Sequence, residues 1–170
     1  MRNNRATGRD MLISLAVILV PCALIYAFFS RTPAEPEVAA ADWKPVVAGA
    51  RTDATYQVLA PTNLPENWKP IRARWGDTQL QLGFLSPDKT YYELKQMAGA
   101  KNPEFVREVT QSGAEEGTSD ALGRSWKRMV SNKGRTHCLV SSVEGAKAST
   151  AVVCADAPYE AVEAFVGTLA

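Results

Sequence analysis

The chain has 170 residues, enough for one ordinary domain and a further segment. Its 19 Lys and Arg nearly balance its 18 Asp and Glu. Nucleic-acid-binding domains usually carry a marked basic excess, so this balance argues against wholesale nucleic-acid binding. The only histidine is His137, and any histidine-dependent triad or ordinary catalytic zinc site would have to be built around it.

The longest apolar stretch is residues 11–29, which contain no charged residue. About 20 apolar residues cross a bilayer as a helix, so this stretch predicts a transmembrane helix with a kink at Pro21. Residues 1–10 hold three arginines and one aspartate, and this bias predicts a cytoplasmic N-terminal tail. A cleaved signal peptide is the alternative, but its apolar core is normally about 7–15 residues. We therefore expect a signal-anchored, single-pass cell-membrane protein whose domain is extracytoplasmic.

Residues 30–41 read SRTPAEPEVAAA, with two prolines, acidic side chains and no apolar period. This composition predicts an extended linker. The domain then occupies residues 42–170, and Trp43 is expected to pack at its start. Beyond the flanks of the apolar stretch, the chain holds 15 basic and 17 acidic residues, so the domain carries little net charge.

Alternation of apolar and polar residues predicts strands within the domain. Asn102 and Pro103 mark the start of one helix, and a second follows Pro158. The Gly-, Ser- and Glu-rich stretch 112–123 is predicted to be a loop. Each half then runs strand, strand, strand, helix, which predicts an α+β fold with one antiparallel sheet of about six strands and two helices packed on one face. The predicted strands are 71–75, 79–84, 91–97, 125–130, 136–143 and 149–155.

Two cysteines of the domain fall on neighbouring predicted strands of a hairpin whose loop centres near Ala146. Cys138 then faces Cys154 across the hairpin, on one face of the sheet. Directly opposed residues satisfy the distance that a disulfide bond needs, so we predict a bond between them. Two reduced, buried thiols are the alternative, and a register shift of one residue would forbid the bond.

Charged residues are unevenly distributed along the domain. Residues 124–147 carry six basic side chains against Glu144, while residues 104–120 carry five acidic side chains against a single arginine. Such a separation can create an anion-attracting surface, which Arg72 and Arg74 on one face of an earlier strand would extend. Solvated strand faces and turns are the alternative interpretation. The candidate anion-binding residues are Arg72, Arg74, Arg124, Lys127, Arg128, Lys133 and Arg135.

Motifs that carry known chemistry are absent from the sequence: it holds no HExxH, GxSxG, P-loop or GxGxxG. His137 falls in a predicted strand, where a packed or surface role is the simpler interpretation. The acidic Glu115, Glu116 and Asp120 fall in a predicted loop, which lacks the rigid cleft that paired catalytic carboxylates need. We predict no catalytic residues, no cofactor and no metal site.

Short motifs along nearly the whole chain resemble those of a known family. The chain is similar to actinobacterial single-pass envelope proteins catalogued as domain of unknown function 4245. The resemblance implies an envelope location and carries no activity, cofactor or catalytic residue. The motifs are Arg9-Asp10-Met11, Leu64-Pro65 with Trp68, Leu82-Gly83-Phe84-Leu85, Pro87-Asp88 and the closing helix.

These features together favour a membrane-anchored, non-enzymatic domain. We expect it to bind a cell-envelope component, which could be an anionic polymer or lipid, or another membrane protein. The alternative is a cell-envelope enzyme acting on a glycan or lipid through carboxylates that the sequence does not identify.

Overall fold

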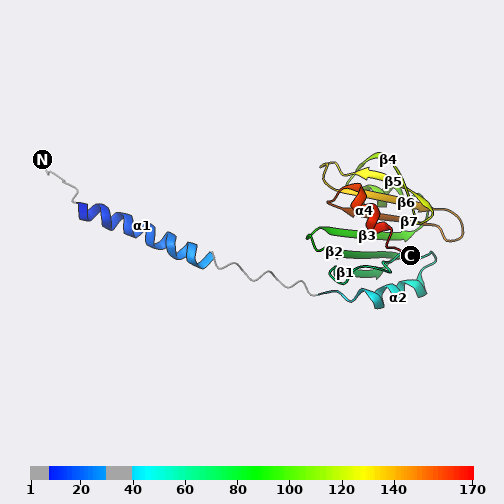
Figure 1. Cartoon of the computed structure of the whole chain (residues 1–170), viewed down its shortest axis with the longest axis horizontal. Helices are drawn as coiled ribbons and strands as arrows, with labels where there is room; N and C mark the ends of the chain where they lie inside the picture. Colours follow the sequence, from blue (N-terminus) through cyan, green and yellow to red (C-terminus); the bar gives the residue numbers. More distant parts are fainter. Residues whose placement is uncertain (1–7, 30–39) are drawn as a thin grey trace. The chain divides into compact units, whose positions relative to one another are not determined.

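The structure is a computed structural model, which describes residues 8–29 and 40–170. The chain divides into two compact units, Met1–Val38 and Ala39–Ala170 (Figure 1). Most of the predicted tail, 1–10, and of the predicted linker, 30–41, lies outside the described residues.

The first unit contains one helix, α1, at Gly8–Phe29. No helix in the described part of the chain is long and apolar enough to cross a membrane, so the predicted transmembrane helix is wrong. The single-pass location, with a cytoplasmic N-terminus and an extracytoplasmic domain, rests on that span, and the same finding overturns it.

The second unit is built on one seven-stranded antiparallel sheet with the strand order β1-β2-β3-β7-β6-β5-β4 (Figure 1). Strand β7 joins the two halves, because it lies between β3 and β6. The strands are β1 Lys69–Gly76, β2 Gln79–Leu85, β3 Tyr91–Ala98, β4 Ala114–Ala121, β5 Arg124–Val130, β6 His137–Val143 and β7 Ser149–Ala155. The helices of this unit are α2 Trp43–Asp53, α3 Pro103–Val109 and α4 Tyr159–Val166.

The sequence prediction of about six strands missed β4, which lies where a loop was expected. This strand forms the edge of the sheet beyond β5, and most of its residues are exposed. A strand exposed in this way has no buried face, so its sequence does not alternate. Its irregular pairing around Gly117, which has a φ of 142°, removes the period further.

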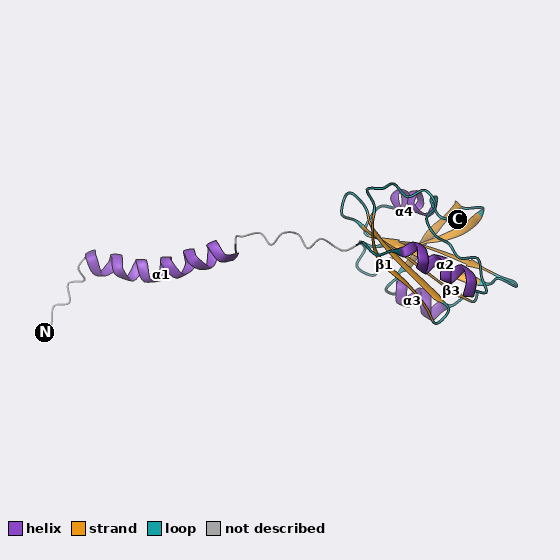
Figure 2. Cartoon of the chain, turned by 90° about the horizontal axis from the view of Figure 1, so that it is seen from below, coloured by secondary structure: helices purple, strands orange, loops and turns teal. Residues whose placement is uncertain are grey.

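The two predicted helices lie on opposite faces of the sheet rather than on one. Figure 2 shows α4 above the strands and α3 below them. One core cluster contains Phe165 of α4 with Val153 of β7, and the other contains Phe105 of α3 with Val152. Because neighbouring residues of a strand point to opposite faces, the two clusters lie on opposite sides of β7.

The helix α2, which was not predicted, shares the α4 face. Its Val47 and Ala50 are buried in the same core cluster as α4. With Trp43 they form an apolar stripe at i, i+4 and i+7, and Pro45 occupies the first turn. The helix signal was therefore present in the sequence.

Aromatic side chains fill the centre of the α4 face. The ring of Phe165 lies 5.5 Å from Trp68, 5.2 Å from Tyr92 and 5.9 Å from Phe84, measured between ring centroids. This cluster joins the last helix to β2, β3 and the segment before β1. Aromatic pairs of this geometry contribute about 0.5–1.5 kcal/mol each beyond their burial.

A buried glutamine of β3 attaches the segment after α2 to the sheet. Gln96 is fully buried, and its amide oxygen accepts a hydrogen bond from the Leu59 backbone at 2.9 Å. Its amide nitrogen donates to the backbone oxygen of Gln57 at 2.8 Å and to the Ser149 hydroxyl at 3.4 Å. The side chain thus replaces a missing strand partner for residues 57–59.

Replacing Gln96 with Leu should therefore lower the free energy of unfolding by about 1–3 kcal/mol, because the backbone groups of residues 57 and 59 lose buried partners. Urea denaturation followed by circular dichroism measures the change. The same substitution at the exposed Gln57 is the matched control and should leave the midpoint nearly unchanged. Equal midpoints for both variants would contradict this role of Gln96.

The register of the β6–β7 hairpin is the one expected from the sequence. Cys138 pairs with Cys154, Val140 with Val152 and Ser142 with Thr150. The Sγ atoms of the two cysteines are bonded, and their Cα atoms lie 4.1 Å apart. The bond lies on the α3 face, in the cluster around Phe105.

Removing this bond with the double substitution Cys138→Ala and Cys154→Ala should cost about 3 kcal/mol of stability, because a loop of this length no longer restricts the unfolded chain. Guanidinium denaturation of the oxidised protein measures the loss. Cys22→Ala, at the exposed free cysteine of α1, is the control and should have no effect. Alkylation of Cys138 and Cys154 in denatured protein without reductant would show that no bond exists.

Candidate functional site

The seven candidate anion-binding residues do not form one surface. Arg72 and Arg74 lie on β1, at one side of the sheet. The other five lie on β5 and in the turn after it, with β2, β3, β7 and β6 in between. Within that second group, Lys127 and Arg128 are neighbours on a strand and therefore point to opposite faces.

Arg128 is committed to an interaction within the domain. Its guanidinium forms an ion pair with Glu163 of α4 at 2.5 Å and donates to the Ser119 hydroxyl at 2.6 Å. It also lies over the ring of Tyr159, 5.1 Å from the centroid. Lys127, on the other face, pairs with Glu115 at 3.0 Å. These contacts fasten α4 and β4 to β5 and occupy both cations.

The environment of Glu163 lowers the pKa of its carboxyl group. The chief cause is a short hydrogen bond donated by Ser119, and the positive charge of Arg128 acts in the same direction. A lowered pKa in the folded state stabilises the fold at pH values above the unfolded pKa of about 4.5, and this contribution is lost as pH falls through the lower folded value.

Glu163→Gln should therefore lower the free energy of unfolding by about 1 kcal/mol at neutral pH, the upper range for partly exposed ion pairs. The difference from the unaltered protein should shrink as pH falls below 4.5 and through the lower folded pKa. The Glu163 carboxyl group then becomes neutral first in the unfolded state and finally also in the folded state. Thermal denaturation at a series of pH values measures this. Glu160→Gln, at an exposed residue of the same helix, is the control. A difference that is independent of pH would contradict the assignment.

Arg124, Lys133 and Arg135 form no ion pair with a described residue, but they lie on β5 and in the turn after it. Arg72 and Arg74 lie on a face of β1 that no helix in the described part of the chain covers. The cluster under α3 draws residues from β3, β5, β6 and β7 but none from β1 or β2. Both arginines are exposed, and neither forms an ion pair with a described residue.

Two glutamines of β2 share this uncovered face with the arginines. Arg74 pairs with Gln81, and Gln79 lies two residues before it on the same face. Because every second residue of a strand points to the same face, the four side chains form two short parallel rows, one on each strand. We call them the open polar face: Arg72, Arg74, Gln79 and Gln81.

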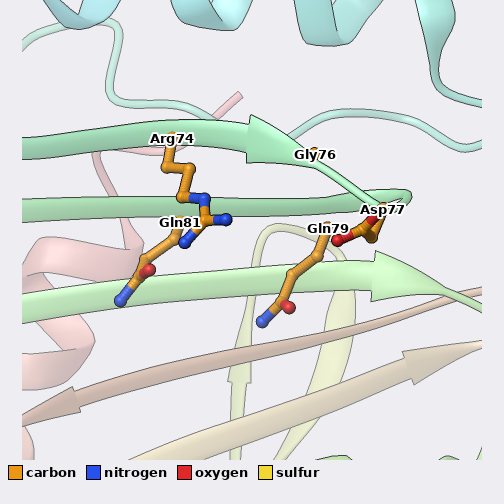
Figure 3. A pocket seen from close by; sticks show the side chains of 5 residues that line it. All are labelled: Arg74, Gly76, Asp77, Gln79 and Gln81. Atoms are coloured by element: carbon orange, nitrogen blue, oxygen red, sulfur yellow. The ribbon is translucent and has the colours of Figure 1, made fainter.

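A hollow of about 240 Å³ lies at the turn end of the open polar face. Figure 3 shows the Arg74 guanidinium beside Gln81, with Gln79 and Asp77 farther along. Gly76 lines the same hollow, and a Cβ atom built on it meets nothing within 4 Å. We call this space the Gly76 hollow. Its lining residues are polar apart from Gly76, and its volume suits one side chain better than a cofactor.

A polar network borders the open polar face on β3. Gln81 donates to the Glu93 carboxylate at 2.6 Å, and Lys95 pairs with the same carboxylate at 3.5 Å. The ring of Tyr91 lies across Gly83, where an added Cβ would fall 2.4 Å from the phenol oxygen. Burial, with Glu93 next in effect, raises the pKa of Tyr91 to about 12, so its hydroxyl stays protonated.

A second groove, of about 450 Å³, runs from β3 to the end of α3. It contains two carboxylates, but Glu93 already accepts from Gln81 and interacts with Lys95, and Asp156 accepts from the Thr136 hydroxyl at 2.5 Å. Carboxylates held in this way by neighbours are poorly prepared for general acid–base work.

The other residues considered for chemistry lie elsewhere. His137 is half-buried, with Nδ1 2.7 Å from the Ala157 carbonyl oxygen and its ring against Tyr159. Glu115, Glu116 and Asp120 lie on β4 and not in a loop. Among the residues whose positions are described, no three His, Cys, Asp or Glu side chains come together as a metal site.

The sequence analysis missed Gly76, Gln79 and Gln81 as parts of a candidate site. The signal was available, because the short turn after Gly76 makes a hairpin, and its register places Gln81 opposite Arg74. The alternation of Gln79 and Gln81 with leucines predicts a strand but does not by itself indicate a site.

The chain belongs to the family described as "Protein of unknown function (DUF4245)", whose model matches residues 4–169. This membership confirms the resemblance to a family without assigned function, while the actinobacterial origin stays a prediction. No curated protein matches the chain.

Two solved structures show a distant similarity to the chain. One is the complex structure of Pseudomonas aeruginosa MucA/MucB, with 12% identity and a TM-score of 0.39 over 68% of this chain and 35% of that chain. The other is the crystal structure of MucB in complex with MucA(peri), with 13% identity and a TM-score of 0.38 over 66% of this chain and 36% of that chain. The chain thus spans about a third of the length of either.

Proposed function

We propose that residues 42–170 form a non-catalytic binding domain whose ligand is an acidic segment of a partner protein, held on the open polar face. The observation that carries this proposal is the pair of exposed arginines, Arg72 and Arg74, on a rigid strand and without an ion-pair partner in the described structure. Arginine guanidinium groups bind carboxylates through paired, charge-assisted hydrogen bonds.

The glutamines beside the arginines favour a protein ligand over an anionic polymer or lipid. Gln79 and Gln81 add amide donors and acceptors at fixed positions next to the guanidinium of Arg74. Amide groups interact with peptide groups and carboxylates directionally, whereas a lipid surface or polyanion is attracted mainly by net charge. The open polar face therefore fits a ligand whose carboxylates and peptide groups are held at fixed distances from one another.

A catalytic role is less well supported by the same region. The carboxylates Glu93 and Asp156 are both engaged by neighbouring side chains, and the Gly76 hollow is small. An enzyme acting on a glycan would need two carboxylates that converge on one reacting bond.

The full chain should bind a fluorescein-labelled glutamate-rich peptide and not a lysine-rich peptide of equal length, measured by fluorescence polarisation. Binding should weaken as the salt concentration rises from about 0.05 M to about 0.5 M, because salt screens exposed charges. The double substitution Arg72→Ser and Arg74→Ser should weaken it at least tenfold.

The control is the double substitution Lys133→Ser and Arg135→Ser, which removes the same charge from the exposed turn after β5. It should leave the affinity nearly unchanged. Equal losses in both double variants, or binding only to phosphatidylglycerol vesicles, would overturn the proposal. Arg128 is unsuitable for this test, because its loss breaks the contacts with α4.

A further inference from the structure

We infer that the acidic segment binds in an extended conformation with carboxylates on alternate residues, one of which enters the Gly76 hollow. This inference rests on the proposed function and specifies the sequence that the site would select. It follows from three features: the spacing of the arginines, the missing side chain at Gly76 and the position of Asp77.

The arginines set the spacing. Arg72 and Arg74 are two residues apart on β1 and share a face, so their Cα atoms lie about 7 Å apart. An extended segment presents its residues j and j+2 on one side at the same spacing. In a helix those two residues point away from each other, and residues j+3 or j+4 share a side instead. The two cations therefore match an extended acid-x-acid motif.

Gly76 provides the space for one of the two side chains. It continues the row of Arg72 and Arg74 by two further residues, so a side chain there would project on the same face. Nothing in the described structure occupies that position. Gly83, on the neighbouring strand, shows the contrast, because the Tyr91 ring fills the space above it. The space beside Gly76 is therefore empty in the described structure, whereas the space beside Gly83 on the same face is filled by Tyr91.

The two sides of the Gly76 hollow carry opposite charges. The Arg74 guanidinium lies at one side and the Asp77 carboxylate lines the other, beside Gln79 (Figure 3). A carboxylate in the hollow should approach Arg74, while Asp77 repels it or accepts from an N–H of the same segment. Asp77 thus limits the affinity for a purely acidic ligand, and a neutral residue in its place should raise that affinity.

Two peptides of identical composition test the spacing. One contains six repeats of Glu-Ser, and the other three repeats of Glu-Glu-Ser-Ser, in which no two glutamates are two residues apart. Binding to the full chain, measured by fluorescence polarisation, should be about tenfold tighter for the alternating peptide. Gly76→Ala should weaken that binding slightly and Gly76→Val strongly, with no change in net charge, because the added carbons fill the hollow. Asp77→Asn should strengthen it a few-fold.

The possible results separate this inference from the function on which it rests. Equal affinity for the two peptides, with the arginine double variant still weakened, would overturn the alternating motif and leave the acidic-partner proposal standing. The absence of binding to either peptide would overturn both. Circular dichroism checks the fold of the Gly76 variants, and the comparison of peptides on the unaltered chain decides the question even if Gly76→Val fails to fold.

Discussion

The length of α3 determines what this domain can display. The helix has seven residues and is about 10 Å long, and the core cluster under it draws side chains from β3, β5, β6 and β7 and none from β1 or β2. It is centred on the disulfide-bonded hairpin of β6 and β7, where β7 is buried throughout. On the opposite face, α2 and α4 cover the sheet from β1 to β7. On β1 and β2 the α3 face therefore has no helix over it in the described structure, and most of its side chains are polar.

Side chains of one chemical type take different roles on the two faces. Arg128 turns toward α4, where Glu163 and Ser119 satisfy it, and it fastens the last helix to the sheet. Arg74 points to the face that α3 does not reach, where it lines the Gly76 hollow and forms no ion pair with a described residue. A charge count along the chain treats both residues alike. The direction in which each strand residue points decides which arginine contacts a helix and which stays exposed.

Local pairings were predictable from the sequence, whereas the order of the sheet was not. The β6–β7 register follows from a short turn and the alternation around Cys138 and Cys154, which are local features. The position of β7 beside β3 depends on contacts between residues far apart in the chain, and no turn specifies it. For this reason Arg72 and Arg128 looked like parts of one basic surface but lie at different sides of the sheet. The strand β4 was missed for a related reason, since an exposed edge strand needs no apolar alternation.

The charged side chains on the α3 face of the sheet are paired on β3 and exposed to water on β1. Next to the buried residues of β3, Glu93 forms an ion pair with Lys95 and accepts a hydrogen bond from Gln81. Gln81 lies opposite Arg74 in the β1–β2 register and adds no charge. Arg72 and Arg74 lie on the edge strand β1, where water solvates them at little cost. The acidic ligand proposed above would reach them there without breaking the ion pairs and hydrogen bonds that hold β3 and α4 in place.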